Sequence, residues 1–145
     1  MVSVLEFTAK LDGAQEVPPV ATPAEGRANL FFINRPGKPD LLLVLLSVRN
    51  IRGVFAAHIH LGRPGMNGPI VMNLFGPTDP VDIGPETQIV NRAFTRADLV
   101  GPLGGRPLSD LLQNMLAGNT YVNVHTVEHF NGEIRGQICP AHHGR

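Results

Sequence analysis

The fold of this chain is constrained most by eight short apolar segments separated by clusters of glycine, proline, asparagine and aspartate. Most of the segments alternate apolar and polar residues, which is the period of a β-strand with one buried face. The 16 glycines and 13 prolines fall mostly between them, where they favour turns over crossover helices. The sequence therefore predicts an all-β fold, a Greek-key antiparallel β-sandwich or flattened barrel. The predicted strands are Val2–Leu11, Gly26–Ile33, Leu41–Arg49, Val54–Leu61, Ile70–Phe75, Thr87–Ala93, Tyr121–Thr126 and Glu133–Ile138.

One or two short helices interrupt the predicted strands. Residues Thr95 to Asp98 are similar to a capping box and begin a brief helical turn. A second segment carries a stripe of apolar residues at helical spacing and ends at Gly118, a residue that commonly terminates helices. We expect this stripe to pack on the core; its members are Leu108, Leu111, Leu112, Met115 and Leu116.

Composition excludes several classes of partner. The 12 basic and 12 acidic residues balance, and no basic run is present, so nucleic acid and anionic membranes are not expected partners. The longest apolar run, Leu41 to Ser47, is far shorter than the roughly 20 residues of a membrane-spanning helix. The single cysteine, Cys139, excludes an internal disulfide, and the amino terminus lacks a signal-peptide pattern. We expect residues 1–140 to form one domain and residues 141–145 a flexible tail.

Two histidines, His58 and His60, lie two residues apart in the predicted strand Val54–Leu61. Side chains two apart on a strand leave from the same face, so both rings are able to approach one ion. The alternation predicts that these histidines point away from the core. The residues predicted to point inward are Phe55, Ala57, Ile59 and Leu61.

A third histidine, His125, is predicted to share this outer face. In its strand Val122 and Val124 are predicted to point into the core. Tyr121, Asn123 and His125 then point outward. Pairing Val124 with Ile134 across the predicted hairpin places Glu133 opposite His125, where a carboxylate is able to orient a ligand histidine.

These three imidazoles predict a metal site formed by His58, His60 and His125. Three nitrogen ligands with an open position suit Cu(II), our first choice, and zinc is the alternative. The competing interpretation is that His58 and His60 only cap the outer face through hydrogen bonds to loop carbonyls, with His125 a separate cross-strand neighbour. Candidates to support the ligands are Glu133, Tyr121 and Glu16, whereas a structural charge pair between Arg135 and Glu133 is favoured over catalysis by Arg135. The roles of His129, Cys139, His142 and His143 stay open.

Four sequence blocks resemble the CHRD domain, which is named for chordin and also occurs as a stand-alone bacterial protein. The blocks run in order from about residue 5 to residue 138: Leu11-Asp-Gly-Ala-Gln-Glu-Val-Pro-Pro19, Ala56-Ala-His-Ile-His60 with Gly65-Met-Asn-Gly-Pro69, Gly118-Asn-Thr-Tyr-Val-Asn-Val-His-Thr126, and Gly132-Glu-Ile-Arg-Gly-Gln137. The resemblance implies an extracytoplasmic location, secreted or periplasmic. Chordin is an antagonist of growth factors, so the resemblance also implies, as an alternative, a metal-independent protein-interaction module.

The histidine pattern is similar, more distantly, to the β-barrel of copper–zinc superoxide dismutases. There a His-x-His pair and a later strand histidine hold copper, which leaves a copper-dependent redox enzyme acting on an oxygen species as a further alternative. The Gly62–Gly68 loop lacks the histidines and aspartates of a second metal site, so a dismutase zinc site is not expected. No residue identifies a protein partner or a homodimer interface.

Overall fold

The computed structural model describes residues 1–141 and contains all eight predicted strands. Two further strands, β6 and β10, have only three and two residues, too few for a readable period. The strands are β1 Ser3–Asp12, β2 Glu25–Asn34, β3 Leu41–Arg49, β4 Ile51–Leu61, β5 Ile70–Phe75, β6 Val81–Ile83, β7 Thr87–Phe94, β8 Thr120–Thr126, β9 Ile134–Gln137 and β10 Cys139–Pro140. The helices are α1 Leu108–Leu116 and the 3-10 turns Gly13–Gln15, Arg96–Asp98 and Gly101–Leu103.

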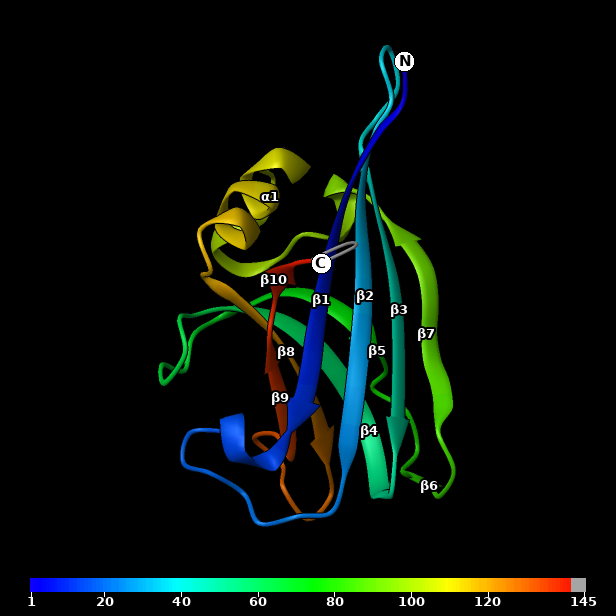
Figure 1. The fold of residues 1–145 in the computed structure, drawn as a ribbon, viewed down its shortest axis with the longest axis vertical. Coiled ribbons are helices and arrows are strands. Elements are labelled where there is room, and N and C mark those ends of the chain that lie inside the picture. The colour runs from blue at the N-terminus through cyan, green and yellow to red at the C-terminus, as the bar shows by residue number, and fades with distance from the viewer. Residues whose placement is uncertain (142–145) are drawn as a thin grey trace.

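The strands form one antiparallel sheet that curls into a flattened, nearly closed barrel. The order is β5-β4-β8-β9-β1-β2-β3-β7, so several neighbours in the sheet are far apart in the chain. In Figure 1, β1, β2, β3 and β7 form the front layer and β4, β5 and β8 cross behind it. Beyond β7, a bridge between Met72 and Leu99 and a 2.8 Å hydrogen bond from Val100 N to Val71 O bring the two edges together. The predicted fold class is confirmed.

The core follows the predicted alternation. Leu42, Val44 and Leu46 of β3 face Val122 and Val124 of β8 in one apolar cluster. The predicted helix α1 covers one end of the barrel (Figure 1) and buries its own apolar stripe there, chiefly Leu108, Leu111 and Met115. None of the helices in the described part of the chain is long and apolar enough to cross a membrane.

Strand β4 departs from the predicted alternation at Phe55. This residue was expected to point inward, but its ring stacks on Phe130 at 5.2 Å between centroids and lies 6.2 Å from the ring of His125. The pairing of β4 with β8 shifts register between Val54 and Ala56, which inserts an extra residue and turns Phe55 outward. The prediction for Phe55 is therefore wrong. Ala57 and Ile59 lie in the core as expected, so His58 and His60 keep their predicted face.

A single residue, Asn50, joins β3 to β4 across the barrel. These strands do not pair with each other, because β3 pairs with β2 and β7 while β4 pairs with β5, β6 and β8. Asn50 has a φ of 53° and its N–H donates to the carbonyl of Gly84 at 2.9 Å. Asparagine tolerates this left-handed conformation better than most residues with a Cβ.

Replacing Asn50 with valine should therefore destabilise the fold. We expect Asn50→Val to lower the free energy of unfolding by about 1–2 kcal/mol, since a β-branched residue is strained at positive φ. Urea unfolding followed by circular dichroism measures the change, with Asn50→Gly as the control that should stay near the parent. Equal stability of the valine variant and the parent would contradict this explanation of the corner.

Candidate metal centre

The predicted histidines meet on one face of the neighbouring strands β4 and β8. The cross-strand pairs are Ala56 with His125, His58 with Asn123 and His60 with Tyr121. One nitrogen from each of His58, His60 and His125 lies within 4.8 Å of the others, which is a spacing that permits binding to a common ion. Within residues 1–141, this is the one group of three or more histidine, cysteine, aspartate or glutamate side chains whose ligand atoms lie this close together.

Backbone carbonyls from two loops hold two of the rings. Nδ1 of His60 lies 2.8 Å from the carbonyl oxygen of Gly68, and Nδ1 of His125 lies 2.8 Å from that of Phe130. A carbonyl only accepts hydrogen bonds, so each Nδ1 carries a proton and each Nε2 presents a lone pair. The buried Nε2 of His60 has no hydrogen-bond partner.

His58 completes the group of three rings through Nδ1, whereas His60 and His125 present Nε2. Nδ1 of His58 lies 3.0 Å from Nε2 of His125, to which it donates a proton when no ion is bound. A metal ion held here would take the place of that proton, which would move to Nε2 of His58. Nδ1 of His58 and Nε2 of His60 and His125 would then be the three ligand atoms.

The site is more enclosed than the sequence predicted. His60 and His125 are each 8 % exposed and His58 is half-buried, because loops cover the face that was expected to be open to solvent. Burial lowers the pKa of His58 to about 4, with the neighbouring His125 and His60 adding to the effect. Burial also lowers the pKa values of His60 and His125, opposed by their hydrogen bonds to carbonyls. All three rings are therefore neutral at pH 7, the form that binds metal ions.

Tyr121 supports His60 by stacking. The two rings are 4.8 Å apart between centroids with an interplanar angle of 8°, and the Tyr121 hydroxyl accepts a 3.2 Å hydrogen bond from the N–H of Gly68. Gly68 therefore holds His60 through its carbonyl and Tyr121 through its N–H. Tyr121 was a candidate to support the ligands, and the structure gives it contact with one of them.

The carboxylate of Glu133 forms its hydrogen bonds with two threonines. The predicted pairing of Val124 with Ile134 is confirmed, but the Glu133 carboxylate accepts hydrogen bonds from Thr126 at 2.8 Å and Thr22 at 2.6 Å. Glu133 precedes the first residue of β9, so strand alternation does not fix the direction of its side chain. Its carboxylate ties the β8–β9 hairpin to the β1–β2 loop, and its hydrogen bonds reach no histidine ring.

Arg135 does not pair with Glu133 as predicted. Its side chain is 1 % exposed, and its guanidinium lies 3.4 Å above the centre of the Tyr121 ring. Nη2 of Arg135 donates to the carbonyl of Arg63 at 3.0 Å, whereas the sequence offered no signal for a carbonyl partner. Glu16 is also buried on this face, at 6 % exposure, and burial raises its pKa to about 7 against the opposing charge of Arg135.

Neither His129 nor Cys139 belongs to the cluster. His129 lies in the β8–β9 hairpin with Nε2 3.5 Å from the exposed carboxylate of Glu128. Cys139 is an exposed free thiol in β10. His142 and His143, like most of the predicted tail, lie outside the described residues.

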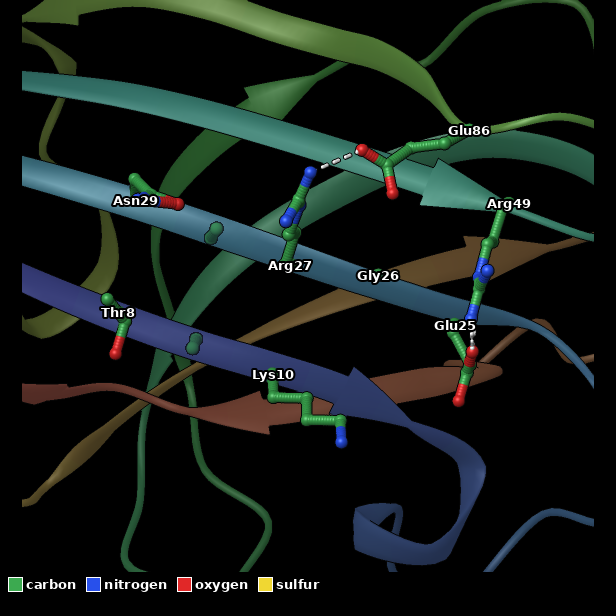
Figure 2. A pocket seen from close by; sticks show the side chains of 10 residues that line it. Thr8, Lys10, Glu25, Gly26, Arg27, Asn29, Arg49 and Glu86 are labelled. Atoms are coloured by element: carbon green, nitrogen blue, oxygen red, sulfur yellow. Dashed lines mark hydrogen bonds and ion pairs between the residues drawn. The ribbon is translucent and has the colours of Figure 1, made fainter.

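A cavity of about 510 Å³ lies elsewhere, on the outer face of β1, β2 and β3 (Figure 2). None of the three clustered histidines lines it. Its charged side chains largely neutralise one another, because Arg27 pairs with Glu86 at 2.7 Å and Arg49 pairs with Glu25. These exposed ion pairs are typical of a solvated sheet face, so the histidine cluster is the better candidate for chemistry.

Comparison with known families identifies the domain that carries this cluster. The CHRD domain family model matches residues 7–138, nearly the whole chain, and the matched range includes all three histidines. No curated protein and no solved structure matches the chain. The likeness to superoxide dismutases therefore rests on the order of the three histidines and the barrel alone. The chain belongs to the CHRD domain family.

Proposed function

We propose that this CHRD-domain protein binds a transition-metal ion through His58, His60 and His125. The observation that carries the proposal is Nε2 of His60, a buried nitrogen with no hydrogen-bond partner that faces two other imidazoles. Leaving a buried polar atom unpaired costs free energy, and a bound metal ion removes that cost by accepting the lone pair. The carbonyls that fix both Nδ1 protons support the same conclusion.

Copper is the metal that this donor set suits best. Three neutral imidazoles with an open position suit a tetragonal Cu(II) site that takes a water molecule as a further ligand. Zinc is the alternative, because three histidines and a water are also a common zinc arrangement. Carboxylate and carbonyl oxygens, which Mg²⁺ and Ca²⁺ prefer, are missing from the donor set.

Replacing a ligand histidine should abolish specific metal binding. We expect His58→Ala, His60→Ala and His125→Ala each to lower Cu(II) affinity by about 100-fold or more, since a ligand contributes at least as much as the groups that orient it. Elemental analysis of tag-free protein gives the metal and its stoichiometry. A Cu(II) titration followed by quenching of the single tyrosine, Tyr121, gives the affinity.

His129→Ala is the matched control for these variants. It removes a histidine of the adjacent hairpin that lies outside the cluster, so its affinity should equal that of the parent. Parent-like binding by His58→Ala, or equal losses in His129→Ala and His58→Ala, would refute the proposed site.

Acid should weaken metal binding less than at an exposed cluster of histidines. Protons compete with metal ions only as the pH falls through the pKa of each ring, and burial lowers the pKa of all three rings, that of His58 to about 4. From pH 7 to pH 5.5 we expect a loss of affinity at least about eightfold smaller than at an exposed cluster, because His58, with a pKa of about 4, stays neutral over this range. An exposed three-histidine peptide should lose nearly three orders of magnitude, because each of its three rings, with a pKa near 6.5, loses about eightfold of its neutral form. A titration of both at the two pH values measures the difference, and equal losses would contradict the buried site.

We also propose an extracytoplasmic location, secreted or periplasmic. Resemblance to chordin, an extracellular protein, supports this location. The three histidine ligands and the single cysteine do not require reducing conditions. Cell fractionation of the producing organism would test the location, and recovery in the cytosolic fraction alone would refute it.

A further inference from the structure

A layer of buried polar atoms without partners continues beyond the three histidines. Within residues 1–141, five buried side-chain atoms have no hydrogen-bond partner. One of them is Oγ1 of Thr120. The other four come from Glu16, His60, Asn123 and Arg135, and all four residues lie on or over the histidine-bearing face. Unpaired buried polar atoms are rare in folded proteins, so such a group needs an explanation.

Asn123 lies at the centre of this layer. It stands opposite His58 of β4 on one side and opposite Arg135 of β9 on the other, so the three residues form a row across three strands. Its amide also lies near the ring of His60, although it forms no hydrogen bond with the unpaired Nε2. Any group that contacts Asn123 is therefore placed to act on the ligands of the metal site.

The Glu16 carboxylate reaches this row from the loop between β1 and β2. A Cβ atom added to Gly132 would lie 2.6 Å from Oε2 of Glu16 and 2.7 Å from Nδ2 of Asn123. Both groups thus pack against Gly132 at the place where a Cβ atom would lie, which only a residue without a side chain permits. Gly132 also has a φ of 124°, a conformation that favours glycine.

The charges on this face do not cancel when a metal ion binds. Three neutral imidazoles bring no negative charge to a divalent ion, and the guanidinium of Arg135 is already buried nearby. Glu16 is the acidic residue among the four, and no ion pair joins it to Arg135 in the described chain. Burial disfavours its charge in the metal-free protein, and a cation on the same face offsets that cost.

We propose that Glu16 is a positioning residue of the metal centre, whose carboxylate acts through Asn123 to favour a divalent over a monovalent ion. This inference rests on the proposed metal-binding function. It assigns a role to the β1–β2 loop, which delivers the carboxylate to a site otherwise built from β4 and β8. Because the interaction is electrostatic, its strength scales with the charge of the bound ion.

The test compares the affinities of Cu²⁺, Zn²⁺ and Cu⁺ in the parent and in Glu16→Gln. This substitution keeps the shape of the side chain and removes its charge. We expect Cu²⁺ and Zn²⁺ affinities to fall on the order of tenfold, and Cu⁺ affinity to fall only about threefold, since half the charge halves the energy. Glu16→Asp retains the charge and should restore most of the preference for divalent ions. Glu25→Gln removes an exposed carboxylate at the start of β2 and should change none of the affinities.

Equal losses for all three ions in Glu16→Gln would overturn the proposal, because they would indicate a purely structural role. Unchanged affinities would also overturn it, while leaving the metal site intact if His58→Ala still abolishes binding. Absence of metal binding by the parent would instead refute the proposed function itself. If Glu16→Gln does not fold, Asn123→Ser breaks the same connection from the strand side, and an ion-independent loss there would overturn the proposal.

Discussion

The pairing of β4 with β8 is the interaction on which the rest of the candidate site depends. Residues 67 positions apart, His58 and His125, contact each other only because these strands are neighbours in the barrel. The register shift between Val54 and Ala56 lies just before the histidines, and the pairing from Ala56 to Leu61 is then regular. A slip of one residue after this point would send His58 and His60 into the core.

The sequence predicted the strands and the face of each histidine because both follow from the period of two. It did not predict the direction of Phe55, since a register shift leaves no mark in an apolar run of this kind. The competing interpretation included hydrogen bonds to loop carbonyls, but the sequence did not identify Gly68 and Phe130, because every residue has a backbone carbonyl. The threonine partners of Glu133 were not predicted either, because Glu133 precedes β9 and strand alternation does not fix the direction of its side chain.

The strands bring the three imidazole rings together, and the loops determine which nitrogen of a ring presents its lone pair. Strand geometry brings three imidazoles together, but each ring has two nitrogens, and the carbonyls of Gly68 and Phe130 determine which nitrogen presents its lone pair. The same loops exclude water from His60 and His125, which keeps those rings neutral. An exposed His-x-His pair on a bare sheet would have neither property.

Burial on this face has a cost that binding can offset. An unpaired Nε2 on His60 and an unpaired Nη1 on Arg135 each destabilise the metal-free fold, because their hydrogen bonds to water are lost without replacement. Apolar residues at these positions would fill the same space without that cost. The presence of imidazole, amide, guanidinium and carboxyl groups in one enclosed layer therefore supports the proposed ion site, since stability alone does not account for it. Glu16 fits this explanation, because a buried carboxylate beside a cation is stabilised by the charge that it offsets.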